Sequence, residues 1–243
     1  MDKTVAPEKI EALRSLSTCA VANAIETFDL RLRNAGFADA SLRCFFENLP
    51  PTVGYAATAR VRTSVPPMQG HSYYDRTDWW NSILAVPEPR VVVVEDVERH
   101  PGLGSLVGGV HANILRALGC VAFVTNGGVR DLTAVEQTGL QFFAGNVTVS
   151  HAYAHIFEFG TPVQIGGLRI SPGDLLHGDR HGILQIPRKI AEEIPAVAAQ
   201  MLANERRIID ACHARDFSLE RLRSTILEIE SSRVAGKPNR TEE

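Results

Sequence analysis

Hydrophobic and polar positions alternate with two different periodicities along this chain. Near its start, apolar residues recur every three to four positions, which predicts a helix over residues 6–35. Short runs rich in valine, alanine and phenylalanine then predict strands at 54–63, 90–97, 120–126 and 140–146. Short helices separate these runs, and the unbroken valines from Val91 to Val94 favour a strand covered on both faces. The pattern therefore predicts an α/β protein with parallel strands.

The last third of the chain changes character twice. Residues 162–187 hold short β runs between glycine-rich turns, which predicts hairpins that form a second small sheet or a partial barrel. Residues 188–232 return to helical spacing, as a C-terminal helical extension whose second helix is capped by Ser218. The polar tail, 233–243, is expected to be disordered. We expect a single domain over 1–232 with its core at about 15–205.

Composition and charge are those of an ordinary globular protein. Of the 243 residues, 44% are hydrophobic and 22% are charged, and the net charge is -3. That charge predicts no direct binding to nucleic acid or to an anionic membrane surface. No signal peptide is expected, and no apolar run reaches the ~18–20 residues that span a bilayer. The cysteines form no CxxC pair, and Cys19 and Cys120 lie in apolar contexts typical of buried thiols. We expect a cytoplasmic protein.

The segment from Gly102 to Asp131 carries the strongest functional signal. It predicts a glycine-rich turn, a helix over about 110–118, the strand 120–126 and a second glycine turn that brings Arg130 beside Asp131. Ligands bind at the carboxyl ends of parallel strands, and helix N-termini favour anions. Arg130 can clamp a carboxylate, and Asp131 can bind Mg²⁺ or Mn²⁺. An Arg-Asp pair after a strand is also common as a solvated ion pair, so spacing alone leaves both interpretations open.

These residues carry a resemblance to the RraA-like family, which includes regulators of ribonuclease activity and class II 4-hydroxy-4-methyl-2-oxoglutarate aldolases. The positions that resemble its glycine segment and Arg-Asp motif are Gly108, Gly109, Val110, His111, Ala112, Gly119, Val124 and Asn126 to Asp131. Those that resemble its Pro-Gly-Asp hairpin are Pro172, Gly173, Asp174, Asp179, Gly182 and Pro187. The resemblance implies a swivelling-type α/β/β fold that assembles as a homo-oligomer, a trimer or hexamer, with sites near subunit interfaces.

The resemblance also implies roles for single residues. In the aldolase branch, the aspartate matching Asp131 binds a divalent metal, largely through water. The arginine matching Arg130 binds the pyruvyl group and stabilises its enolate, and backbone amides of the segment Gly108 to Ala112 hold the carboxylate. This chain departs from the pattern twice, because Gly109 and Asn126 stand where the active aldolases carry acidic residues. Both departures remove a carboxylate that would support the metal's water shell or move a proton.

Histidines are the remaining candidates for proton transfer. His111 lies at the helix start and is a candidate proton carrier, with local packing as the alternative. His151 and His155 are spaced i,i+4, but the glutamate of a zincin motif is absent, which favours core or interface packing. His177 and His181 are interpreted as solvated turn residues, with reach into a neighbouring subunit's site as the alternative.

Aromatic residues gather at 70–80. Tyr73, Tyr74, Trp79 and Trp80 are expected either at an oligomer contact or at the mouth of an active site, with the contact favoured.

Two function hypotheses follow. The first is a divalent-metal-dependent lyase, an aldolase or oxaloacetate-type decarboxylase, that acts on a small 2-oxo acid through a pyruvate-type enolate. Arg130 and His111 would be its catalytic residues. The alternative is a catalytically silent RraA-like regulator that binds a protein of the RNA-degradation machinery. A methyltransferase is disfavoured, because no glycine-rich nucleotide-binding unit follows a first strand.

Overall fold

The structure, a computed structural model, describes residues 4–67 and 76–235. Its contacts divide the chain into two compact units, 1–195 and 196–243. The first unit holds the sheets and the order of strand, helix and strand that the sequence predicts before Arg130. The single domain over 1–232, with its helical extension over 188–232, stays a prediction.

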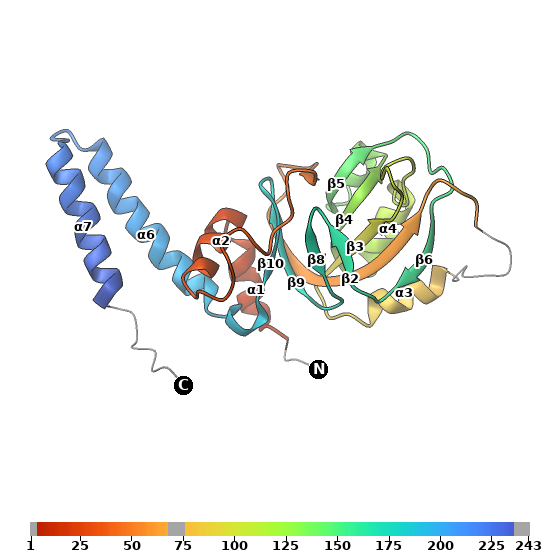
Figure 1. Cartoon of the computed structure of the whole chain (residues 1–243), viewed down its shortest axis with the longest axis horizontal. Helices are drawn as coiled ribbons and strands as arrows, with labels where there is room; N and C mark the ends of the chain where they lie inside the picture. The colour runs from red at the N-terminus through yellow and green to blue at the C-terminus, as the bar shows by residue number, and fades with distance from the viewer. Residues whose placement is uncertain (1–3, 68–75, 236–243) are drawn as a thin grey trace. The chain divides into compact units, whose positions relative to one another are not determined.

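The first unit is built on an eight-stranded mixed sheet in the order β1-β5-β4-β3-β2-β9-β10, with β6 also paired to β2. In Figure 1, β5, β4, β3 and β2 follow one another across this sheet. The parallel strands are β2 (Thr52–Arg62), β3 (Arg90–Asp96), β4 (Cys120–Val129) and β5 (Gln141–Val147). The antiparallel strands are β1 (Arg43–Cys44), β6 (His155–Phe159), β9 (Leu175–Asp179) and β10 (Gly182–Ile186).

Strict alternation along the parallel strands gives the sheet two apolar faces. Val92 and Val94 face one core, which includes residues of α3 (Arg76–Leu84), α4 (Gly109–Ala117) and α5 (Leu132–Glu136). Val91 and Val93 face a second core against a two-stranded sheet of β7 (Val163–Ile165) and β8 (Leu168–Ile170). Helices, main sheet and small sheet thus form the three layers of the predicted α/β/β fold, and the prediction that Val91 to Val94 are covered on both faces is confirmed.

The main sheet curves until it is nearly a closed barrel. The ring of Phe143 on β5 lies so close to Gly178 on β9 that a Cβ at position 178 would approach it within 2.7 Å. The hairpin segment therefore contributes in both ways that the sequence predicts: β7 and β8 form the small sheet, and β9 and β10 complete the curved one.

The predicted N-terminal helix over 6–35 is wrong in its length. The structure has two helices, α1 (Pro7–Arg14) and α2 (Thr18–Glu26). Ser17 separates them, because its side chain accepts a hydrogen bond from the amide of Ala20 and so begins a new helix. Cys120 is buried as expected, but Cys19, on α2, is exposed, which corrects the expectation of a buried thiol there.

The interpretation of His177 as a solvated turn residue is also wrong. His177 lies within β9 and is fully buried, with hydrogen bonds to Thr18 and to the carbonyl oxygen of Leu13. Asp179 accepts a hydrogen bond from the amide of Thr18 at 2.9 Å. These contacts join the β9–β10 hairpin to the junction of α1 and α2. His181, on the turn, is exposed as expected.

Residues 188–235 are largely helical, as predicted. They form a short 3-10 helix (Arg188–Ile190) and the helices α6 (Ile194–His213) and α7 (Leu219–Ala235). The Ser218 hydroxyl accepts a hydrogen bond from the amide of Arg221, which confirms the predicted cap. Residues 233–235 still belong to α7, and the rest of the tail predicted as disordered lies outside the described residues. No helix in the described part of the chain is long and apolar enough to cross a membrane.

Candidate functional site

Arg130 and Asp131 follow the carboxyl end of β4, at the edge of the sheet where the sequence places them. The predicted second glycine turn is wrong, because Gly127 and Gly128 belong to β4, which continues to Val129. The strand bulges between Thr125 and Gly128, and Gly128 pairs with Ser105 in an isolated bridge. Side chains would not fit there: a Cβ at Gly128 would approach Thr148 within 2.7 Å. The glycines therefore serve close packing of β4 rather than a turn.

Asp131 turns its side chain back onto the start of α4. Its backbone is left-handed, with φ 54°, a conformation that aspartate tolerates better than most residues. Its Oδ2 atom accepts the amide of Gly109 at 3.0 Å, and its Oδ1 atom accepts the Nε of Arg130 at 3.3 Å. The Gly109 amide lowers the pKa of Asp131, with a smaller contribution from Arg130. Asp131 is therefore a carboxylate at neutral pH.

The predicted carboxylate-binding residues at the start of α4 have separate roles. Gly108 precedes the helix, and a Cβ there would lie 2.5 Å from Oδ2 of Asp131, so only glycine leaves room for this carboxylate. Gly109 donates its amide to Asp131, whereas the amide of Ala112 donates to the Gly108 carbonyl inside the helix and is not available to a ligand. Val110 is 78% exposed. The anion at this helix N-terminus is thus the side chain of Asp131 itself.

Asn126 has a structural role that a carboxylate would not fulfil. Its Oδ1 atom accepts the amide of Asp96 at 2.7 Å, and its Nδ2 atom donates to the Asp96 carbonyl at 2.9 Å. This pair of bonds ties β4 to β3 near the site. Asp96, which the sequence did not single out, is buried, and its carboxylate accepts the amides of Gly102 and Glu98. Burial raises the pKa of Asp96.

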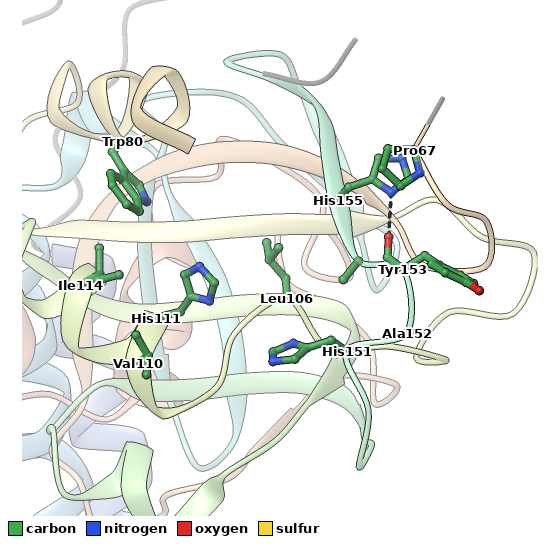
Figure 2. A pocket seen from close by; sticks show the side chains of 11 residues that line it. Pro67, Trp80, Leu106, Val110, His111, Ile114, His151, Ala152, Tyr153 and His155 are labelled. Atoms are coloured by element: carbon green, nitrogen blue, oxygen red, sulfur yellow. Dashed lines mark hydrogen bonds between the residues drawn. The ribbon is translucent and has the colours of Figure 1, made fainter. Parts of the chain in front are cut away.

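A pocket of about 540 Å³ lies beside the start of α4. Three histidines line it, His111 from α4, His151 from the loop before β6, and His155 from β6 itself. Figure 2 shows the ring of His151 directed toward the start of α4, where Val110 and His111 lie. His151 and His155 therefore share a pocket wall, and the sequence interpretation of both as core or interface packing missed this.

The aromatic segment lies in part outside the described residues, including Tyr73 and Tyr74. Trp79 and Trp80 belong to α3. Trp79 is 2% exposed and packs in the core, so it lies neither at a site mouth nor at a contact surface. Trp80 lines the histidine pocket together with Leu106 and Ile114. Sequence spacing gave no sign that the loop 148–154 and α3 meet at the start of α4, because these segments are far apart along the chain.

Asp131 is the candidate metal ligand of this site. Within residues 4–67 and 76–235, no three His, Cys, Asp or Glu side chains are grouped so that they could hold a metal ion. Asp131 is a single carboxylate with a side chain that is 41% exposed. That set fits a Mg²⁺ ion that keeps several waters and takes further oxygens from a substrate, and it does not fit a closed zinc site.

The comparisons with known proteins agree on the family. The family model described as RraA-like, Aldolase/RraA, matches residues 18–184. The chain belongs to the RraA-like family. This family includes class II aldolases and ribonuclease regulators. The matched range contains the strands of the main sheet through Leu184, the start of α4 and the Arg130–Asp131 pair.

Individual RraA-like relatives are distant. Over 123 residues, the chain is 28% identical to a Halalkalibacterium halodurans protein named "Putative 4-hydroxy-4-methyl-2-oxoglutarate aldolase", covering 49% of this chain and 59% of that protein. A crystal structure from Pseudomonas syringae matches with TM-score 0.70 at 22% identity, covering 93% of this chain and 97% of that one. The RraAS2 protein of Streptomyces coelicolor matches with TM-score 0.64 at 20% identity, covering 84% and 96%. At such identities the structures establish the fold alone.

Proposed function

We propose that this protein is a lyase that releases pyruvate from a small 2-oxo acid, by retro-aldol cleavage or by decarboxylation of an oxaloacetate-like substrate. One observation carries the proposal: Arg130, Asp131 and the glycine start of α4 converge at the carboxyl end of β4. The fold places a guanidinium, a carboxylate of lowered pKa and a helix N-terminus within one small region. The name of the Halalkalibacterium halodurans relative supports the same reaction class.

Both reactions build negative charge on the oxygen of the 2-oxo group, because the electrons of the broken C–C bond pass into an enolate. The guanidinium of Arg130 would bind the substrate carboxylate and offset this charge. A Mg²⁺ or Mn²⁺ ion held by Asp131 through water would polarise the 2-oxo group. Asp131 also fixes the start of α4 by accepting the Gly109 amide, so the backbone around the substrate is ordered before binding.

The test is pyruvate release measured with lactate dehydrogenase and NADH, in the presence of Mg²⁺, from oxaloacetate and from 4-hydroxy-2-oxo acids. Arg130→Ala should lower kcat/KM by about 10²–10³-fold, the range seen when one group that stabilises a developing oxyanion is removed. Arg169→Ala is the matched control, because Arg169 is an exposed arginine of β8 away from the site. Equal activity of wild type and Arg130→Ala would contradict the proposal, and no turnover of any acid would favour the regulator.

We also propose that the protein assembles as a homo-oligomer, a trimer or hexamer. Exposed apolar side chains gather beside the site, with Leu103 57%, Val147 47% and Val149 93% exposed. Their two segments adjoin, since the Thr148 hydroxyl donates to the Leu103 carbonyl. Apolar groups this exposed are typical of a surface that a second protein covers. Light scattering after size-exclusion chromatography should give a mass of three or six chains, and a monomer would exclude both.

A further inference from the structure

The histidine pocket has the composition of a binding site for an uncharged group. Trp80, Leu106 and Ile114 supply apolar surface, and the three histidines supply polar atoms. No lysine, arginine, aspartate or glutamate is among its described lining residues. Its volume of about 540 Å³ exceeds by far the ~30 Å³ that a water molecule occupies, so the pocket can accept a ring-sized organic group.

Hydrogen bonding sets the protonation pattern of His151. Its Nδ1 atom lies 2.6 Å from the carbonyl oxygen of Ser105. A carbonyl oxygen only accepts, so Nδ1 carries the proton and donates it, and Nε2 of the neutral ring presents a lone pair. A general base is commonly a histidine in which a carbonyl oxygen orients one ring nitrogen, so that the other nitrogen can accept a proton. His151 therefore brings a basic nitrogen to the pocket in a fixed orientation.

The pocket and the Arg130–Asp131 pair adjoin. Gly108 and Gly109 contact Asp131, and the next two residues of the chain, Val110 and His111, line the pocket. On the other side, the amide of Ser105 donates to the carbonyl of Ser150, next to His151, and Ser105 pairs with Gly128 of β4.

We propose that this pocket holds the departing, uncharged carbonyl fragment of a 4-hydroxy-2-oxo acid, and that Nε2 of His151 accepts the proton of its C4 hydroxyl group. The proposal rests on the lyase function and extends it to a substrate class. The pyruvyl part lies at Arg130, and C4 with its substituent extends past the start of α4 into the pocket. The base comes from the loop before β6, whereas position 109 of the helix has no side chain.

The step balances with one proton. His151 takes the proton of the C4 hydroxyl, the C4 oxygen forms a carbonyl, and the C3–C4 bond breaks. Its electron pair becomes the enolate that Arg130 stabilises. The protonated His151 then returns the proton to C3 of the enolate, which gives pyruvate and an aldehyde or ketone and restores the neutral ring. Decarboxylation of oxaloacetate forms the same enolate by loss of CO₂ and removes no hydroxyl proton, so that reaction does not need His151 as a base.

This difference gives the test. In His151→Asn, the amide nitrogen takes the place of Nδ1 and keeps the bond to the Ser105 carbonyl, while the basic nitrogen is lost. We expect kcat for cleavage of 4-hydroxy-2-oxo-4-phenylbutanoate to fall by about 10²–10⁴-fold. Oxaloacetate decarboxylation should fall by less than about tenfold, because the neutral ring begins that reaction without the C4 proton and water can protonate C3. His181→Asn is the matched control, because His181 is an exposed turn histidine whose Nδ1 lies 3.0 Å from Asp179. Thermal unfolding checks folding, and His151→Gln replaces the variant if His151→Asn does not fold.

Each outcome has one meaning. Equal loss of both reactions in His151→Asn would show a structural role and overturn the proposal, as would unchanged cleavage. A wild-type protein that decarboxylates oxaloacetate but cleaves no 4-hydroxy-2-oxo acid would overturn this inference and leave the lyase function standing. A wild type that releases pyruvate from neither would overturn both.

The uncharged character of the fragment has its own measurement. The wild type should show a kcat/KM for 4-hydroxy-2-oxo-4-phenylbutanoate at least about tenfold above that for 4-hydroxy-2-oxoglutarate. The second carboxylate of 4-hydroxy-2-oxoglutarate would lose its hydration in the pocket, and the described lining residues include no lysine or arginine to pair with it. A preference for the dicarboxylate would overturn the substrate class.

Discussion

His151 and His177 each bind a backbone carbonyl oxygen, and they differ in what the second ring nitrogen meets. In His177, Nε2 donates to the Leu13 carbonyl and Nδ1 accepts from the hydroxyl of Thr18, both at 3.0 Å, with no surface exposed. In His151, Nδ1 donates to the Ser105 carbonyl, and the ring lines an open pocket. One ring is therefore fully used in joining β9 to the N-terminal helices, and the other keeps a nitrogen for chemistry.

The number of ring nitrogens that form hydrogen bonds distinguishes the structural histidine, His177, from the pocket histidine, His151. Sequence context had suggested the opposite assignment. The spacing of His151 and His155 favoured packing, and the turn residues around His177 favoured solvent. In the structure, His177 is the packed histidine and His151 is the more exposed one. A histidine with both nitrogens bonded inside the core stabilises the fold, because removing it leaves two polar partners unsatisfied.

The largest expected effect comes from truncating the fully bonded ring. His177→Ala leaves the Leu13 carbonyl and the Thr18 hydroxyl without this partner and opens a cavity, so the free energy of unfolding should fall by about 3 kcal/mol. His151→Ala should lower it by less than about 1 kcal/mol, since this ring is near the surface. Urea unfolding followed by fluorescence measures both. Losses of equal size would remove the distinction between the two histidines.

The same counting of partners applies to Asn126, whose two amide atoms both bond to the backbone of Asp96. Asn126→Asp replaces the donor with a second acceptor facing the Asp96 carbonyl, and should cost about 2 kcal/mol in urea unfolding. The control is Asn113→Asp, because Asn113 is exposed and makes a single bond to Gly109, and its change should be within about 0.5 kcal/mol. An unchanged Asn126→Asp variant would show that a carboxylate is tolerated at this position.

The smallest effect is a difference in pH dependence. Burial lowers the pKa of His177 below its ordinary value of 6.5, so the unfolded chain binds this proton more readily than the native state does. The stability from the neutral ring is complete above about pH 6.5 and is lost as the pH falls toward the native pKa, at up to about 1.4 kcal/mol per pH unit. His177→Gln should reduce this slope and His181→Gln should not. Equal slopes in all three proteins would contradict the assignment.

The parallel strands and their two faces could be predicted from the sequence. Val91 to Val94 alternate between two cores, and this alternation follows from the geometry of any strand. The position of Arg130 and Asp131 at the end of β4 was also predictable, because both residues directly follow the apolar run that predicts this strand. The α/β/β layers and the family came from motifs rather than from periodicity, and the family model confirms both.

What could not be predicted depends on contacts between distant segments. Gly127 and Gly128 indicated a turn, yet both lie within β4, where Gly128 pairs with Ser105 and with Asn146 of β5. Asp131 was expected as a metal ligand, and only the fold shows that its carboxylate also occupies the helix start. The histidine pocket required the loop 148–154 to fold against α4. Local sequence patterns do not predict such contacts between residues that are far apart along the chain.

The amide of Asn126 has a consequence for the lifetime of the protein. Asparagine followed by glycine is the dipeptide that most readily loses ammonia, and here the two residues are Asn126 and Gly127. The reaction needs the backbone nitrogen of glycine to attack the side-chain carbon, a rearrangement that the Asp96 bonds and the strand conformation oppose. Asn126 should therefore deamidate slowly in the folded protein. Unfolded chains held at alkaline pH should accumulate aspartate and isoaspartate here, and should refold with β3 and β4 less firmly joined.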